Sequence, residues 1–325
     1  MVADAVRGVY GESYFNRRVY DQGWLASEIE AGRMAPVVVR DGRTIAGHLA
    51  LLRPAPNPHL VELGLGVVHP AYRKRGILAF LTRLLTAAAA EDARCPGVLV
   101  MPVAAHRITQ RVAARQGHAD TGFLLSYLPG AMVERYGAAR SGAVLLAFRA
   151  LGALKAEGET GRATGRSLHI PAEDGGWIAP VRAAARLAEP LIAHREDAAP
   201  ARPSSAISES VNPASRRARL SVAAIGQDLD ACVARFERGL GPGFGAEAIL
   251  ALDDPAAPRA IRRLRRRGYA MTALFPHYFA NGAHGAVMFS AAGDWGLGAI
   301  DPYSETATAI LAQVRAARER ELVPG

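Results

Sequence analysis

A basic turn between an apolar strand and an apolar helix is the segment of this sequence with the clearest chemistry. Three cations at positions 73–75 are followed by Gly76, and the spacing of apolar residues from Ile77 onward predicts an amphipathic helix. Such a turn directs backbone N–H groups at one point, where the positive end of the helix dipole adds to the cationic side chains. The segment 67–78 therefore predicts a pyrophosphate site, and a basic surface turn that only caps a helix is the alternative.

This turn resembles the signature loop of the GNAT N-acyltransferase superfamily, which reads Arg or Gln, two residues, Gly, any residue, and then Gly or Ala. The chain reads Arg73-Lys74-Arg75-Gly76-Ile77-Leu78 at that place, after a strand that ends Val-x-Pro-x-Tyr. Leu78 departs from the pattern, because the family has a small residue there. The resemblance implies that an acyl-CoA, such as acetyl-CoA, is the co-substrate and that its diphosphate lies on this loop.

The resemblance also implies that the pantetheine arm of the co-substrate pairs with the strand before the loop, in the manner of an added strand. The strand residues that it would follow are Leu65, Gly66, Val67 and Val68. Gly64 and Gly66 predict a bulge or a close approach of a ligand in this strand. Two glycines that simply weaken an edge strand are the alternative.

Acylation of an amine needs a base that removes a proton from the ammonium group. Glu62 lies in an otherwise apolar strand, five residues before Val67. Several GNAT enzymes carry a glutamate in this region that deprotonates the amine, so the resemblance implies this role for Glu62. The alternative is the solvent-facing member of an alternating strand.

His106 is the second candidate for proton transfer. Counted back from Gly117, it lies where many GNAT members have an asparagine that contacts the cofactor. Three roles stay open for it: contact with pantetheine, transfer of a proton, or the start of a helix. Ala113 lies where many members have a tyrosine acid, so Tyr127 or His106 would substitute for that acid, or the thiolate would leave unassisted.

The elements that position these residues follow from apolar periodicity. Helices are expected at 24–31, 77–92 and 106–116, and strands at 37–40, 44–52, 60–68, 97–101 and 121–128. This order predicts a mixed α/β fold, a GNAT-like central sheet flanked by helices, over residues 1–130. Residues 131–165 are expected to be a connector with one strand, at 143–149, inside it.

Residues 166–325 are expected to form a second, degenerate GNAT-like domain. A basic helix at 257–267, Gly268 and an apolar strand repeat the order found at 109–118 and its strand, but no second copy of the basic loop occurs. A polar segment at 194–218 predicts a long loop. Phe275 and Tyr278 lie in an aromatic stretch and are candidates for the wall of the acceptor pocket.

Composition narrows the function classes. The 325 residues carry a net charge of +9, which fits a polyanionic ligand, an acidic carrier protein or a plain compositional bias. The two cysteines lie apart from any other residue at ligand spacing, so no metal site is expected. No 18-residue apolar window and no secretory leader occur, so we expect a cytoplasmic protein without a membrane partner.

Three functions remain at this stage. An N-acyltransferase acting on a small-molecule amine is the leading hypothesis. A GNAT-like sensor or scaffold that binds acyl-CoA without turnover is the rival. Nucleic-acid binding is disfavoured because the arginine clusters lack interleaved aromatic residues. The acceptor, the acyl chain length and a homodimer all stay open.

Overall fold

One mixed sheet of eleven strands runs through the molecule. The structure is a computed structural model, and it describes residues 2–14, 16–54, 56–134, 141–151 and 165–322. Its strand order is β1-β2-β3-β4-β6-β5-β12-β13-β11-β10-β9. The first six strands are β1 (Met34–Asp41), β2 (Thr44–Leu52), β3 (Val61–Val68), β4 (Gly97–Val100), β5 (Ala119–Pro129) and β6 (Ser141–Ala150). The other five are β9 (Ala206–Asn212), β10 (Arg217–Ala224), β11 (Gly245–Ala251), β12 (Ala270–Phe275) and β13 (Gly285–Ser290). The expected mixed α/β class is confirmed.

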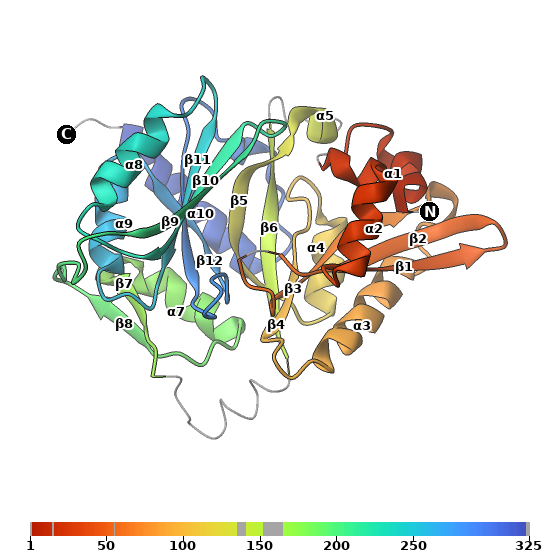
Figure 1. The fold of residues 1–325 in the computed structure, drawn as a ribbon, viewed down its shortest axis with the longest axis horizontal. Coiled ribbons are helices and arrows are strands. Elements are labelled where there is room, and N and C mark those ends of the chain that lie inside the picture. Colours follow the sequence, from red (N-terminus) through yellow and green to blue (C-terminus); the bar gives the residue numbers. More distant parts are fainter. Residues whose placement is uncertain (1, 15, 55, 135–140, 152–164, 323–325) are drawn as a thin grey trace.

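Helices cover the sheet, as Figure 1 shows. In the first half they are α1 (Val2–Tyr10), α2 (Gln22–Glu30), α3 (Ile77–Ala90), α4 (Arg107–Arg115) and the short α5 (Gly130–Val133). In the second half they are α7 (Gly175–Ala184), α8 (Leu229–Arg238), α9 (Ala257–Arg265) and α10 (Glu305–Leu322). A separate parallel pair, β7 (Leu168–Pro171) and β8 (Leu191–His194), lies beside them.

The two halves of the sheet repeat one topology. In the first half β3 pairs with β4 in parallel, while β2 with β3, β4 with β6, and β5 with β6 are antiparallel. In the second half β10 pairs with β11 in parallel, while β9 with β10, β11 with β13, and β12 with β13 are antiparallel. Along the chain α3 connects β3 to β4, as α8 connects β10 to β11. In the same way α4 connects β4 to β5, as α9 connects β11 to β12. The second half is therefore built on the same plan as the first.

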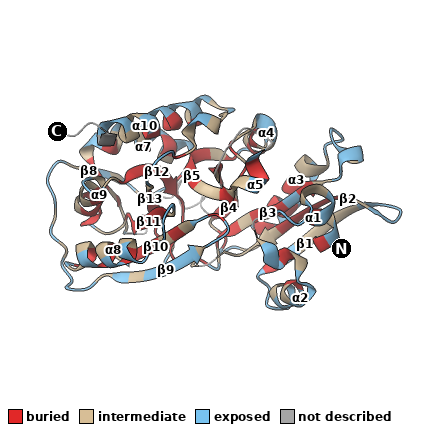
Figure 2. Cartoon of the chain, turned by 90° about the horizontal axis from the view of Figure 1, so that it is seen from above, coloured by how far each residue is buried: buried red, intermediate tan, exposed pale blue. Residues whose placement is uncertain are grey.

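The halves meet where β5 pairs with β12, at Gly122 and Ala273. A Cβ at Gly122 would lie 2.2 Å from the Cα of Ala273, so only glycine permits this close contact. Figure 1 shows the two halves side by side with β5 and β6 between them, and in Figure 2 the buried residues concentrate along the strands of both halves. One continuous apolar core, which includes Phe148 and Phe289, spans the junction.

Two expectations about the middle of the chain need correction. The segment 131–165 is not only a connector, because it contains α5 and β6, and β6 pairs with both β4 and β5 inside the sheet. The segment 194–218 is not only a loop, because it contains β9 and the start of β10. β9 is an edge strand with mostly exposed polar side chains, so it lacks the apolar alternation by which strands are recognised.

Candidate active site

The basic loop has a backbone that turns N–H groups outward. Lys74 and Gly76 both adopt left-handed conformations, with φ of 64° and 78°. Gly76 is the N-cap of α3, and no side chain forms a capping hydrogen bond there in the described chain. A Cβ at position 76 would meet no protein atom, so the need for glycine comes from its φ rather than from protein crowding. The first turn of α3 therefore keeps N–H donors for an anion.

A groove of about 740 Å³ runs along this loop. Five segments line it: the end of α1, the end of β3, the loop, the start of α3 and one face of α4. Of the residues that the sequence assigns to the cofactor, it contains Gly66, Val67, Val68, Arg73, Lys74, Gly76, Ile77 and Leu78. Arg75 does not line the groove, and its guanidinium lies 5.0 Å from the centre of the Tyr72 ring. Arg111 and Arg115, one turn apart on α4, add two further cations to its wall.

A bulge interrupts β3 where the sequence has its glycines. The register between β2 and β3 shifts between His48 and Ala50, and the residue with positive φ is Leu65, at 56°, rather than either glycine. The Nδ1 atom of His48 donates a hydrogen bond of 2.8 Å to the carbonyl oxygen of Leu65. This buried contact holds the bulge in place.

β3 and β4 separate beyond the bulge. They pair from Val61 and Val98 to Leu63 and Val100, which is the last residue of β4, while β3 continues to Val68 without β4 as its partner. A cavity of about 170 Å³ lies at the opening, and its lining includes Leu65 and Met101. Because parallel strands that separate leave backbone groups unpaired, the opening offers hydrogen-bond partners to a ligand.

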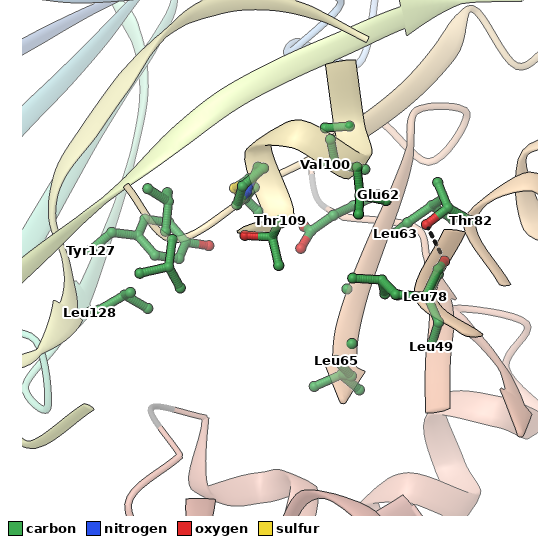
Figure 3. Close-up of a pocket in the computed structure, with 18 of the residues that line it drawn as sticks. Leu49, Glu62, Leu63, Leu65, Leu78, Thr82, Val100, Thr109, Tyr127 and Leu128 are labelled. Carbon is green, nitrogen blue, oxygen red and sulfur yellow. Dashed lines mark hydrogen bonds between the residues drawn. The ribbon is translucent and has the colours of Figure 1, made fainter. Parts of the chain in front are cut away.

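Three oxygen-bearing side chains meet in this inner cavity. Glu62, Thr109 and Tyr127 come from β3, α4 and β5, and in Figure 3 they point toward one another. The Thr109 hydroxyl is buried and has no hydrogen-bond partner among the described residues. His106, the residue that precedes α4, lines both this cavity and the groove. The cavity and the groove thus share one wall.

Burial sets the protonation of this cluster. Loss of solvent raises the pKa of the Glu62 carboxyl to about 7, although the positive charge of Arg219 acts in the opposite direction. Burial also raises the pKa of the Tyr127 hydroxyl, which therefore stays protonated near neutral pH. Glu62 can accept a proton near pH 7, and Tyr127 can donate one.

A third cavity, of about 70 Å³, lies on the other side of Glu62. Glu62, Met101 and Tyr127 line both this cavity and the inner one, so the two adjoin. Its far wall comes from the second half of the chain and contains Arg219, Phe275 and Tyr278. The structure thus brings the two aromatic candidates for an acceptor wall next to Glu62, more than 200 residues away in the sequence.

The corresponding loop of the second half is partly covered, and a cavity of about 300 Å³ beside it is lined by Gly226, Arg259 and Arg263. β10 and β11 stay paired from Arg217 and Gly245 to Val222 and Leu250, so these strands do not separate as β3 and β4 do. The loop that follows β10 is covered by residues 202–205: the N–H of Gly226 donates to the Ser205 hydroxyl at 2.9 Å. A Cβ at Gly226 would lie 2.2 Å from the backbone of Ser204. Residues 202–205 therefore cover part of the place that corresponds to the basic loop of the first half.

Sequence reasoning missed several residues that line these cavities. Arg111 and Arg115 carried a usable signal, since a spacing of four residues on an expected helix places both on one face. Tyr10 and Tyr14 line the inner cavity from the N-terminal segment, and nothing in their spacing indicates this position. Arg219 lies beside a segment that the sequence presents as a loop.

Neither a metal cluster nor a membrane helix is found in the described part of the chain. Its His, Cys, Asp and Glu side chains form no group of three that could hold a metal ion. None of its helices combines the length and the apolar character that a membrane crossing requires.

Comparison with known proteins gives structural likeness only. No family model matches the sequence, and no curated protein matches it. The structure is similar to an N-acetyltransferase from Staphylococcus aureus Mu50, at 11% identity and a TM-score of 0.38, over 46% of this chain and 89% of that one. It is similar to yncA of Salmonella typhimurium, a putative acetyltransferase solved with acetyl-CoA, at 15% identity and a TM-score of 0.37, over 46% and 87%. A chimera of the spermidine N-acetyltransferase SpeG from Vibrio cholerae and hSSAT matches at 12% identity and a TM-score of 0.32, over 39% and 72%. Each of these likenesses covers less than half of this chain.

Proposed function

We propose that this chain is an acyl-CoA-dependent N-acyltransferase of the GNAT type, which transfers an acyl group, in the simplest case acetyl, to the amine of a small molecule. One observation carries the proposal: the groove along the basic loop continues into the cavity that holds Glu62. Gly66, Leu78, His106 and Thr109 line both spaces. A ligand with phosphates on the loop could therefore place its far end beside a base.

The groove suits a long polyanionic thioester. Arg73, Lys74, Arg111 and Arg115 supply positive charge along it, and the uncapped first turn of α3 supplies N–H donors. Leu65, the residue with positive φ at the bulge, lines the inner cavity, and in this proposal the amides of pantetheine pair with the backbone of β3 there. In this proposal Leu65, Gly66, Val67 and Val68 follow the pantetheine arm and the loop from Arg73 to Leu78 holds the diphosphate.

Starting from the ammonium group, two protons leave the nitrogen in the reaction, and the negative charge on the carbonyl oxygen must be stabilised. In our proposal Glu62 takes the first proton from the ammonium group, directly or through one water, and the nitrogen lone pair attacks the thioester carbonyl carbon. The C–N bond forms, and backbone N–H groups at the separated strands stabilise the oxyanion. The C–S bond then breaks, and the nitrogen loses its second proton. This proton replaces the one that Tyr127 or His106 gives to the departing thiolate, or it passes to solvent when the thiolate leaves unassisted as a good leaving group.

The two halves have different parts in this proposal. The first half, residues 1–130 together with β6, binds acyl-CoA. The second half, residues 166–325, keeps the GNAT-like plan but has its loop partly covered by residues 202–205. In this proposal it supplies a wall of the acceptor site instead of a second catalytic centre. Phe275 and Tyr278 form that wall, with their ring centres 4.8 Å apart.

Calorimetric titration with acetyl-CoA tests the proposal. The parent protein should bind, and Gly76→Glu should abolish binding, because it puts a carboxylate and a disfavoured left-handed side chain into the loop. Gly293→Glu is a matched control: Gly293 also has a positive φ, 86°, and open space at its Cβ, but it lies outside the groove. Equal binding by both variants, or no binding by the parent, would refute the proposal.

Turnover separates an enzyme from a sensor that only binds acyl-CoA. Release of the free CoA thiol in the presence of amines should occur with the parent and be lost in Gly76→Glu. Tight binding of acetyl-CoA without any amine-dependent release of thiol would favour the sensor.

A further inference from the structure

β10 presents a polar row to the junction between the halves. Arg217, Arg219 and Ser221 alternate with Ala218, Leu220 and Val222 along this strand, and the latter three are fully buried in the core. Since side chains of a strand alternate between its faces, the three polar residues share the other face. The Ser221 hydroxyl and the Tyr278 hydroxyl lie 2.7 Å apart, which fixes Tyr278 at the wall of the small cavity beside Glu62.

Two guanidinium groups of this row share one carboxylate. Glu247, opposite Arg219 on β11, forms an ion pair with Arg219 and lies 3.5 Å from Arg217. The Glu247 side chain is fully buried, whereas those of Arg217 and Arg219 keep 10% and 18% of their surface exposed. The single carboxylate of Glu247 balances only one of the two guanidinium groups, so one positive charge of the row stays unbalanced by Glu247.

The surplus charge faces the reaction site. Arg219 lines the small cavity together with Glu62, and the Arg217 guanidinium lies 4.2 Å from the centre of the Tyr127 ring. No ion pair within 4.0 Å joins Glu62 to either arginine in the described chain. Once Glu62 has taken a proton from the acceptor it is neutral, and the positive charge of the row has no counter-ion in the described part of the protein.

We propose that the acceptor is an amine that also carries a carboxylate, as in an amino acid, with the carboxylate bound at Arg219 and Tyr278 and the amine directed at Glu62. This inference rests on the proposed acyl transfer. A guanidinium donates two parallel hydrogen bonds to a carboxylate, and a tyrosine hydroxyl can add a third donor. A cavity of about 70 Å³ has room for a few atoms, which suits a carboxylate close to the amine rather than a long chain. A second cationic group, as in a polyamine, would be repelled by the row.

Matched pairs of acceptors test the inference. The rate of CoA thiol release from acetyl-CoA is measured with each of several amino acids and with the amine that its decarboxylation leaves. Phenylalanine with phenethylamine and leucine with isoamylamine are two such pairs. We expect kcat/KM to be at least tenfold higher for a carboxylate-bearing member. Equal or higher rates for the decarboxylated amines would overturn the inference and leave the acyl transfer intact.

Variants of Arg219 localise the effect. Arg219→Gln should raise KM for the amino acid at least tenfold and remove the preference over its decarboxylated partner, whereas Arg219→Lys should restore part of the preference. Arg219→Gln leaves Glu247 paired with Arg217, so one carboxylate still balances one guanidinium in this variant. Binding of acetyl-CoA, which should stay unchanged in both variants, checks that they fold. A preference that survives in the folded Arg219→Gln variant would overturn the inference.

If no acceptor of the panel reacts, the binding of the acceptors is measured instead of their turnover. The same pairs are then titrated into protein saturated with CoA. Binding of amino acids alone supports the inference, and equal binding or no binding of both members overturns it. Failure of the acyl-transfer proposal is recognised separately, by the absence of acetyl-CoA binding in the parent protein.

Discussion

Replacement of Glu62 by glutamine should inactivate the protein and stabilise it at the same time. The pKa of this carboxyl lies near 7 in the folded chain, against an ordinary value of 4.5, because burial opposes its ionisation. A carboxyl whose pKa is raised by folding weakens the folded state as the pH rises above the unfolded value, and the cost is complete above the folded value. A difference of roughly 2.5 pH units corresponds to about 3 kcal/mol.

The sign and the pH dependence distinguish this effect from a loss of packing. At pH 8.5 Glu62→Gln should raise the free energy of unfolding by about 3 kcal/mol, because glutamine has no charge to bury. At pH 5 the parent carboxyl is protonated in the folded state, so the gain should fall below about 1 kcal/mol. At both pH values kcat/KM of Glu62→Gln should be lower than that of the parent by about 10²- to 10⁴-fold, the usual effect of removing a general base.

Urea unfolding at both pH values provides the assay, with Glu196→Gln as the control on an exposed glutamate. The control should change stability little at either pH. If Glu62→Gln instead lowers stability at pH 8.5, Glu62 is held as an anion by the arginines of β10, and its assignment as the base is wrong. A gain that is the same at pH 5 and pH 8.5 would equally refute the argument from burial.

Three further predictions concern the same site and the junction. The parent kcat/KM should rise with pH through an apparent pKa near 7, because Glu62 must be ionised to accept a proton, and this rise should be absent from the residual activity of Glu62→Gln. Thr109→Val should leave the free energy of unfolding unchanged or raise it by up to about 1 kcal/mol, since the hydroxyl lacks a partner among the described residues. Steady-state kinetics of this variant should show a lower kcat/KM, and unchanged kinetics would remove Thr109 from the site. Gly122→Ala should destabilise the chain by about 2 kcal/mol or more in thermal unfolding, because its Cβ would clash with the backbone of Ala273. Gly176→Ala is the control: it lies in α7 with open space around its Cβ, so it should stabilise the chain by about 0.5–1 kcal/mol. Equal melting temperatures for these two glycine variants would contradict the close contact of β5 and β12.

The parts of the fold that sequence reasoning predicts are those specified by neighbouring residues. The helix after the basic loop, the hairpin of β1 and β2, and the strand that carries Glu62 all follow from local periodicity and turn residues. The place of β6 does not, because it lies between β4 and β5, and its partners are set by pairing between distant segments. The polar edge strand β9 has no buried face to reveal it.

The same division holds for the site. The basic loop at 73–76 is local, so its residues can be read from one stretch of sequence. The contact of Arg219 with Glu247 joins two parallel strands 28 residues apart, and the wall that Phe275 and Tyr278 form beside Glu62 depends on the fold of the whole sheet. Spacing along the chain contains no information about such distances.

The cavity beside Glu62 takes its walls from two different halves of the chain. Glu62 and the groove belong to the first half, whereas Arg219 and Tyr278 belong to the second, whose own loop is partly covered by residues 202–205. Substitutions at the second wall can therefore alter what enters that cavity without touching the groove along β3. Under the proposed acyl transfer, libraries confined to the second half would diversify the acceptor range while the acyl-CoA site of the first half stays constant. Under the same proposal, a lineage that carried this architecture would change its acceptor by the same route.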